Sequence, residues 1–148
     1  MRALLLLAPL AVVTAGCGHG DPAVPMSEAA TASTTALGTA GGPDLSKATF
    51  VDETAQTKVA VDAHDNTFSE QYTTVKAGAT VTFTNTGHNE HDVVPVVSGS
   101  FKGIDTADFQ PQGGSGSVTF STPGDYSYYC SLHGTPTKGM TGTIRVLE

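Results

Sequence analysis

Short runs in which apolar and polar residues alternate dominate the chain from about residue 59 to its end. Alternation with a period of two, in runs rich in Val, Thr, Tyr and Phe, is typical of strands with one buried face. These runs span Val59–Ala63, Thr73–Lys76, Thr80–Asn85, Asp92–Val97, Ser117–Phe120, Asp125–Tyr129 and Thr141–Leu147. Seven short strands separated by turn residues predict an all-β sandwich. No segment after Phe50 has the period of an amphipathic helix, although Ile104–Phe109 has room for a turn or two.

The first 47 residues lack this pattern. Met1 and Arg2 precede an apolar run over residues 3–13, and small residues then lead to Cys17. This order is typical of an export signal, and the apolar run is too short to span a bilayer comfortably. The ending Ala-Gly-Cys17 resembles the bacterial lipobox, so we expect residues 1–16 to be a lipoprotein signal peptide and Cys17 to carry lipid. Ordinary signal-peptide cleavage at another position is the alternative.

Residues 17–47 are rich in Ala, Thr, Ser, Gly and Pro. Such a segment buries too little apolar surface to offset the entropy of ordering it, which predicts a flexible tether. We expect the folded domain at residues 48–148, a length sufficient for one compact core.

Composition narrows the classes of function. The net charge is −7, and loss of Arg2 with the signal peptide would leave −8. An acidic chain does not favour nucleic-acid binding and is compatible with steering toward a basic redox partner, or with solubility alone. The only cysteines are Cys17 and Cys130. If the first is lipidated and the second binds metal, no disulfide forms.

The candidate chemistry lies near the C-terminus. Cys130, His133 and Met140 stand on one short stretch, and His91 lies upstream. One thiolate, two imidazoles and a weak thioether are the ligand set of a blue-copper electron-transfer centre. Such soft ligands favour copper over magnesium or calcium, which require oxygen donors. A strand that ends at Cys130 and another that begins near Thr141 would put three of these ligands on one hairpin loop.

Two segments resemble the small cupredoxins of the plastocyanin, amicyanin and pseudoazurin-like group. They are Asn85–Val94, with His-Asn-Glu-His91-Asp-Val-Val, and Phe120–Met140, with Pro-Gly-Asp-Tyr-Ser-Tyr-Tyr-Cys130-Ser-Leu-His133. The resemblance implies a Greek-key β-sandwich of about seven or eight strands. It also implies one copper ion, cycling between Cu(I) and Cu(II), with His91, Cys130 and His133 as strong ligands and Met140 as the axial ligand.

The sequence departs from that group at two points. Six residues separate His133 from Met140, where two or four are usual, and Asp92 follows His91 where many relatives carry Asn. The second change bears on hydrogen bonding around the site.

Each candidate residue also has a plainer interpretation. Cys130 could be a small buried apolar residue, Met140 an apolar residue that closes the loop, and His133 an ordinary loop residue. His88 competes with His91 for the upstream position, and His88 with Glu90 could make a second metal position or lie solvated on a loop.

Alternation along the strand before Cys130 predicts which neighbouring side chains share its face. Tyr126 and Tyr128 are expected on the inward side with Cys130, whereas Ser127 and Tyr129 point the opposite way. Tyr129 would then be the surface neighbour of the cysteine, either coupling it to a partner or serving as an ordinary half-exposed tyrosine.

The leading hypothesis is an exported, membrane-anchored carrier of single electrons between redox partner proteins, held outside the cytoplasm by lipid on Cys17. The alternative is an extracytoplasmic copper-binding or delivery protein. We expect no enzymatic activity, because no catalytic triad, phosphate loop, haem motif or second copper centre can be found in the sequence. We also expect no nucleic-acid partner, given the acidic charge, and a monomer.

Overall fold

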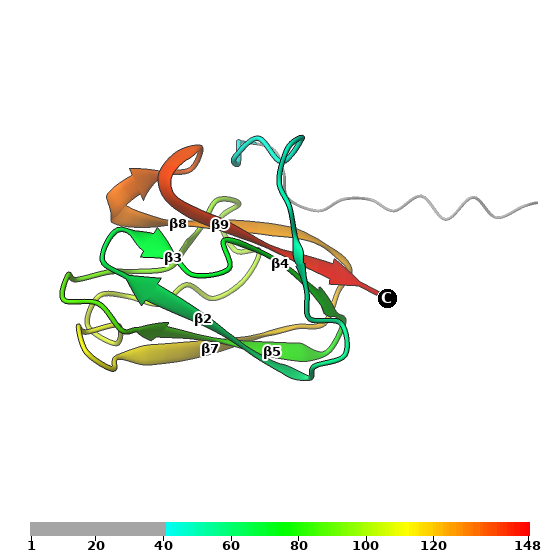
Figure 1. Cartoon of the computed structure of the whole chain (residues 1–148), viewed down its shortest axis with the longest axis horizontal. Coiled ribbons are helices and arrows are strands. Elements are labelled where there is room, and N and C mark those ends of the chain that lie inside the picture. Colours follow the sequence, from blue (N-terminus) through cyan, green and yellow to red (C-terminus); the bar gives the residue numbers. More distant parts are fainter. Residues whose placement is uncertain (1–40) are drawn as a thin grey trace, which may run out of the picture. The chain divides into compact units, whose positions relative to one another are not determined.

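A computed structural model describes residues 41–148, which form nine strands in two sheets (Figure 1). The strands are β1 (Val51–Asp52), β2 (Lys58–His64), β3 (Thr67–Phe68), β4 (Tyr72–Lys76), β5 (Ala79–Asn85), β6 (Val94–Pro95), β7 (Ser115–Phe120), β8 (Gly124–Thr135) and β9 (Lys138–Leu147). One sheet has the order β1-β4-β9-β8-β6 and the other β3-β2-β5-β7. The prediction of an all-β, cupredoxin-like sandwich is therefore confirmed. No helix within these residues is long and apolar enough to cross a membrane.

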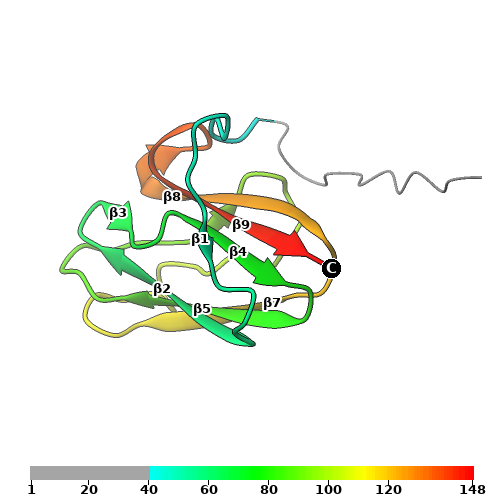
Figure 2. The same cartoon turned by 45° about the vertical axis from the view of Figure 1, so that its right-hand side comes forward.

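Both sheets are mixed. β2 runs parallel to β5, and β4 runs parallel to β9, whereas β5–β7 and β8–β9 are antiparallel. Figure 2 shows β1 beside β4 at the edge of the five-stranded sheet, where the two strands pair in parallel. Parallel neighbours require crossovers from one sheet to the other. Segments distant in sequence therefore meet in the centre of each sheet.

Three predicted strands had wrong boundaries. The run Asp92–Val97 forms only the two-residue β6, because Pro95 has no N–H to donate and Val93 pairs instead with Ile104 as an isolated bridge. The strand expected to end near Tyr129 continues to Thr135, and its partner begins at Lys138 rather than Thr141. Two further strands, β1 and β3, have two residues each and were not predicted.

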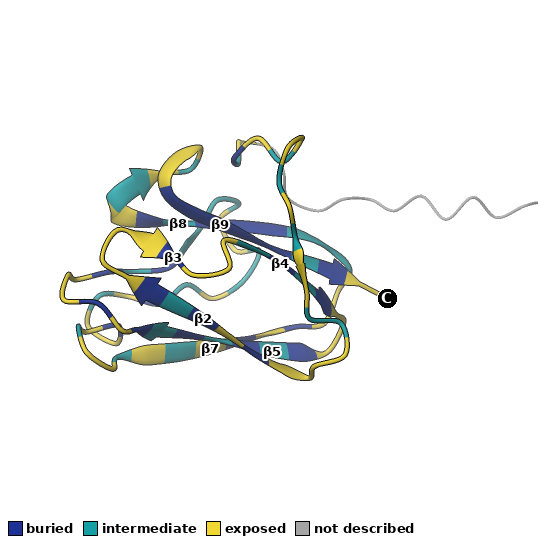
Figure 3. Ribbon diagram, viewed as in Figure 1, coloured by how far each residue is buried: buried dark blue, intermediate teal, exposed yellow. Residues whose placement is uncertain are grey.

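The core lies between the sheets, where Figure 3 shows the buried stretches of the strands. Alternation selects these residues, as in β5, where Ala79, Val81, Phe83 and Asn85 are buried. Tyr128 packs edge-on against Phe68 and Phe83, with ring centroids 5.0 and 5.1 Å away. The aromatic core, defined here as Phe68, Phe83 and Tyr128, therefore joins the two sheets.

The β8 face was predicted correctly, since Tyr126, Tyr128 and Cys130 are buried. Ser127 is buried too, because its hydroxyl pairs with that of Thr143 on β9 at 3.0 Å. Tyr129 is half-buried and lies opposite Val94 of β6. The opposite face of this strand is thus partly covered rather than open.

Residues 41–47 include Pro43, which is buried, and a turn in which the Ser46 N–H donates to the Asp44 carboxylate at 2.9 Å. Farther along the chain, the turn expected at Ile104–Phe109 is present: the Phe109 N–H donates to the Asp105 carbonyl at 3.0 Å. Phe109 is fully buried, so this turn fastens the connection between β6 and β7 to the core.

Candidate metal centre

Three of the predicted ligands meet at one end of the sandwich. His91 Nδ1 and His133 Nδ1 each lie 3.6 Å from Cys130 Sγ. The two imidazole rings are 4.9 Å apart between centroids, and the candidate ligand atoms all lie within 4.8 Å of one another. His91 and Cys130 are fully buried, whereas His133 is half-buried. The cluster therefore has one edge near solvent.

Asn85 organises the loop that carries His91. It occupies the last inward position of β5 and is fully buried. Its Nδ2 donates to the carbonyls of Asn89 and Phe109, at 2.8 and 3.1 Å, and its Oδ1 accepts from the Gly87 N–H at 3.1 Å. One amide thus ties the segment before His91 to the turn before β7.

Asp92 joins the loop of His91 to the strand of Cys130. Its Oδ1 accepts a hydrogen bond from the Ser131 N–H at 2.7 Å, and its Oδ2 accepts from the Ser131 hydroxyl. Each partner directly follows a candidate ligand in sequence. These two bonds therefore fix His91 and Cys130 relative to each other.

An irregularity in the β8–β9 hairpin places Met140 opposite the part of β8 that carries Cys130 and His133. Tyr129 pairs with Thr141, and the next paired positions are Gly134 and Gly139. Four residues of β8, Cys130 to His133, therefore stand opposite the single residue Met140 of β9. Met140 is buried, with 1% of its surface exposed. A bulge of this kind bends the strand and redirects its side chains.

The six residues between His133 and Met140, expected on a hairpin loop, continue the β8–β9 ladder and close it with a turn. Gly134 pairs with Gly139, and Thr135 pairs with Lys138, which leaves Pro136 and Thr137 as the turn. We call this ladder, Gly134–Gly139, the hairpin extension. Gly139 has φ of 83°, and a side chain there would start 2.7 Å from the His133 carbonyl oxygen. Because the added residues pair with one another, the extra length does not separate His133 from Met140.

Burial controls the protonation of the cluster. Burial lowers the pKa of His91, and the nearby His133 lowers it further by a smaller amount. The carboxylates of Asp65 and Asp92 partly offset this lowering. Burial also raises the pKa of the Cys130 thiol, although backbone groups of Asp92, Leu132 and His133 act in the opposite direction. The lowered pKa favours the neutral form of the His91 imidazole, which metal binding requires, and a bound metal would displace the proton of the Cys130 thiol.

The distances fit one shared ion. Metal–sulfur and metal–nitrogen bonds in protein sites are about 2.3 and 2.0 Å, so ligands at about tetrahedral angles lie about 3.5 Å apart. Both sulfur–nitrogen distances here are 3.6 Å. Nδ1 is the nitrogen of His91 directed toward the sulfur, and the other ring nitrogen, Nε2, is buried without a hydrogen-bond partner. The donors present suit a soft or borderline ion such as copper.

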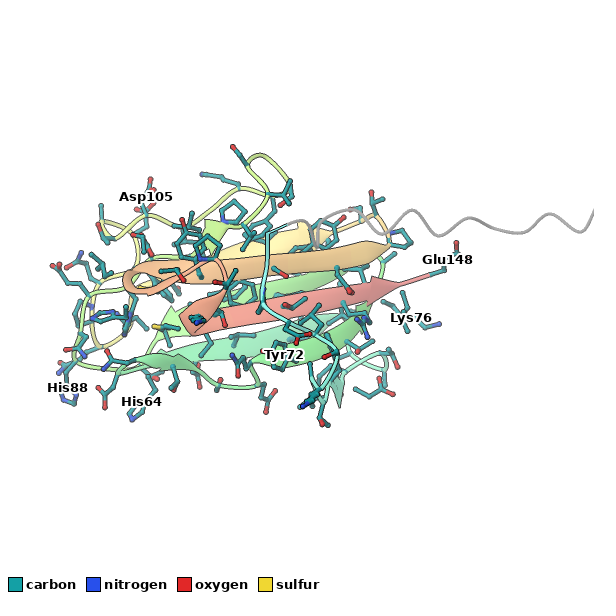
Figure 4. The ribbon with its side chains drawn as sticks, turned by 90° about the horizontal axis from the view of Figure 1, so that it is seen from above. His64, Tyr72, Lys76, His88, Asp105 and Glu148 are labelled. Atoms are coloured by element: carbon teal, nitrogen blue, oxygen red, sulfur yellow. The ribbon has the colours of Figure 1, made fainter. Side chains whose placement is uncertain are left out.

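His88 does not join the cluster. It is exposed, and Figure 4 shows it near His64, at the end of the molecule that also carries Asp105 and opposite Lys76 and Glu148. His64 Nε2 lies 3.7 Å from the Asp65 carboxylate, with both side chains more than half exposed. Among residues 41–148, the only group of three potential ligand residues is His91, Cys130 and His133. Cys17 lies outside the described residues.

Sequence reasoning missed the role of Asn85. The signal was available, because an amide stood at an inward position of an otherwise apolar alternation, directly before Thr-Gly. A buried polar residue at a strand end indicates a hydrogen-bonded loop. Asp65 was also missed. It lies in the turn between β2 and β3 with φ of 49°, and its contribution to the pKa of His91 requires the tertiary structure.

Comparison with known proteins agrees with this geometry. Residues 55–147 match the sequence pattern of the family described as "Copper binding proteins, plastocyanin/azurin family". The plastocyanin of Prochlorothrix hollandica is 32% identical over 112 residues, which cover 69% of this chain and 79% of the relative. The plastocyanin of Scenedesmus fuscus is 35% identical over 95 residues, with 60% and 95% covered.

A solved structure shares the architecture. Amicyanin from Paracoccus versutus superposes with a TM-score of 0.50 at 25% identity, covering 61% of this chain and 81% of that one. The chain therefore belongs to the copper-binding proteins of the plastocyanin/azurin family, a class of small blue-copper cupredoxins. Its cofactor is a single copper ion.

Proposed function

We propose that this protein is an extracytoplasmic type 1 copper protein that shuttles single electrons between redox partner proteins. The observation that carries the proposal is the buried cluster of His91 Nδ1, Cys130 Sγ and His133 Nδ1, in a chain of the copper-binding family. Bound copper supplies a one-electron Cu(II)/Cu(I) couple. We do not assign an enzymatic activity to the protein, which we propose acts as a monomer.

We assign His91, Cys130 and His133 as the strong ligands and Met140 as the weak axial ligand. Met140 is the only methionine between residues 41 and 148, it is buried, and it stands opposite the bulge that carries the other ligands on β8. A long, weak thioether bond is the usual fourth interaction of such sites. The strand register therefore supports Met140 as a ligand, whereas the distances between the ligand atoms support the other three residues.

Hydrogen bonds outside the ligand set hold these side chains in place. Three hydrogen bonds of the Asn85 amide fix the loop before His91, and Asp92 fixes Cys130 relative to it. A site that keeps its geometry needs little rearrangement when its charge changes. This preorganisation suits rapid electron exchange more than metal release.

His133 is the proposed route for electrons. It is half-buried, while His91 is fully buried, and its neighbour Leu132 is an exposed large apolar residue with 52% of its surface accessible. A partner that covers Leu132 would bring its own redox centre close to the His133 ring. Tyr129 offers a second position near Cys130, but it is already half-buried against β6.

We further propose that lipid on Cys17 anchors the protein to the outer face of the cell membrane and that residues 17–47 act as the tether. The apolar run and the Ala-Gly-Cys17 ending support this assignment. Membrane fractionation of cells that express Cys17→Ser tests it. We expect the variant in the soluble or unprocessed fraction and the native chain with the membrane.

The metal assignment is tested with the purified full-length chain. After copper addition we expect intense visible absorption, a paramagnetic Cu(II) signal and reversible one-electron voltammetry. Cys130→Ala should abolish the intense absorption, and His88→Ala, its matched control, should leave it unchanged. Intense absorption in Cys130→Ala would reject the assignment. Copper uptake without a reversible couple or exchange with a cytochrome would instead indicate copper delivery.

A further inference from the structure

Asp92 occupies a fixed position beside the metal cluster. It lies between His91 and Val93, both of which have no exposed surface. Val93 is also held by two backbone hydrogen bonds with Ile104, at 2.9 and 3.0 Å. Asp92 itself is only half-buried, but its backbone cannot move without displacing its two buried neighbours. Its carboxylate is therefore held at one place relative to the cluster.

Both carboxylate oxygens accept hydrogen bonds from one residue. Oδ1 accepts from the Ser131 N–H at 2.7 Å, and Oδ2 accepts from the Ser131 hydroxyl. Ser131 directly follows Cys130, so the carboxylate lies next to the sulfur-bearing residue. An uncharged amide of the same shape could still accept the hydrogen bond from the Ser131 N–H. The effect of the negative charge can therefore be tested separately from the effect of this contact.

The charge acts on a site that carries little charge of its own. Two neutral imidazoles, one thiolate and a thioether give a net charge of zero with Cu(I) and of one positive unit with Cu(II). A fixed negative charge nearby stabilises the positive state and leaves the neutral state almost unaffected.

We propose that Asp92 is a positioning residue whose negative charge lowers the reduction potential of the copper site, in addition to holding Cys130 against the His91 loop. The inference rests on the proposed function. Ser131 has the opposite influence, because its two donors withdraw part of the charge from the carboxylate.

The two residues therefore predict shifts of opposite sign. Asp92→Asn removes the charge and keeps the shape, so reduction should become easier. Ser131→Ala keeps the charge and removes one donor, so reduction should become harder by a smaller amount. A purely structural role of Asp92 would produce no such sign reversal.

Glu90→Gln is the matched control. Glu90 directly precedes His91, carries the same charge and is exposed. Among residues 41–148, the side chain of Glu90 has no hydrogen-bond or ion-pair partner. Solvent screens such a charge, so its removal should have little effect on the site.

The experiment is voltammetry of the copper-loaded full-length protein in detergent, with the electrode as electron donor, at pH 7 and low ionic strength. We expect Asp92→Asn to raise the equilibrium ratio of Cu(I) to Cu(II) at a fixed electrode potential about tenfold, which is about 59 mV for one electron. Glu90→Gln should change it by less than about twofold, and Ser131→Ala should lower it.

A shift in Asp92→Asn no larger than that in Glu90→Gln would overturn the inference. If Asp92→Asn does not fold, Ser131→Ala decides alone, and an unchanged or higher potential in that variant rejects the proposal. Failure of the proposed function is distinguished beforehand, because the native protein would then lack a reversible copper couple. Paramagnetic spectra of each variant identify any change in coordination geometry.

Discussion

The aromatic core lies between the two sheets and the metal centre lies at one end of the sandwich, and the two are built in different ways. Phe68, Phe83 and Tyr128 pack by shape, and their ring contacts require no particular donor or acceptor. Around His91 and Cys130, specific hydrogen bonds hold the loops, such as those of the Asn85 amide and the Asp92 carboxylate. Apolar packing tolerates substitutions that preserve volume, whereas a buried polar network loses stability when one partner is removed.

We expect stability and metal chemistry to be separable, although the two regions adjoin. Tyr128 and Cys130 are successive inward residues of β8. A mutation of the core should lower the free energy of unfolding without altering the copper spectrum of the folded fraction. A mutation of the loop network should affect both.

The largest expected effect is in the core. Phe83→Ala removes a ring with no exposed surface from contact with Phe68 and Tyr128, and it should lower the free energy of unfolding by about 3–5 kcal/mol. Denaturant titration of the metal-free protein measures this. Phe50→Ala is the control, because Phe50 is half-buried against Tyr72 and Arg145 and should cost less. Equal losses in the two variants would contradict the assignment of the core.

Asn85→Ala should have the next largest effect. It removes the donor to the Asn89 and Phe109 carbonyls, whereas the Gly87 N–H keeps its bond to the Ala63 carbonyl, so we expect a loss of about 2–3 kcal/mol. Unlike Phe83→Ala, it should also weaken copper binding, measured by competition with a chelator. Asn89→Ala removes an exposed amide from the same loop and serves as the control. Unchanged copper affinity in Asn85→Ala would show that the loop is held by other contacts.

Removal of the hairpin extension tests whether its length matters to the site. Deletion of Thr135–Lys138 joins Gly134 directly to Gly139, which already pair with each other, and a Gly-Gly turn closes a hairpin readily. We expect the visible spectrum to persist and the free energy of unfolding to change by less than about 1 kcal/mol. Loss of the spectrum would mean that the extension holds His133 in place.

The smallest effect is expected at the hydroxyl of Tyr128. It is buried without a hydrogen-bond partner, so Tyr128→Phe should leave the free energy of unfolding unchanged or raise it by up to about 1 kcal/mol. Tyr126→Phe is a matched control, because it breaks a 2.9 Å bond from the Tyr126 hydroxyl to the Thr122 carbonyl. That variant should lose about 1 kcal/mol. Thermal unfolding of both variants measures the two changes. A larger loss of stability in Tyr128→Phe than in Tyr126→Phe would contradict this prediction.

One further constraint on the core comes from the strand register. Tyr128 lies opposite Gly142 of β9, where a side chain would begin 2.4 Å from the Tyr128 hydroxyl oxygen. Glycine at this position makes room for the ring. The partner residue, and with it the need for glycine, was not predictable from local sequence because it depends on pairing across the hairpin.

Alternation by itself determined much of this protein. It fixed the inward faces of β2, β5 and β8, because successive side chains of a strand point to opposite sides and water excludes one set. The spacing of Cys130 and His133 marked the metal chemistry, since a thiol and an imidazole so close in sequence can share one ion. These features are local, and local features can be recognised without knowing the fold.

The tertiary structure decided what depends on pairing and on bends in the backbone. The six residues between His133 and Met140 form the hairpin extension, and the bulge places four residues of β8 opposite one residue of β9. Strand register sets these arrangements, and it follows from hydrogen bonds between segments distant in sequence. The approach of His91 to Cys130, and the placement of Asn85 and Asp92 around them, likewise exists only once the two sheets have packed together.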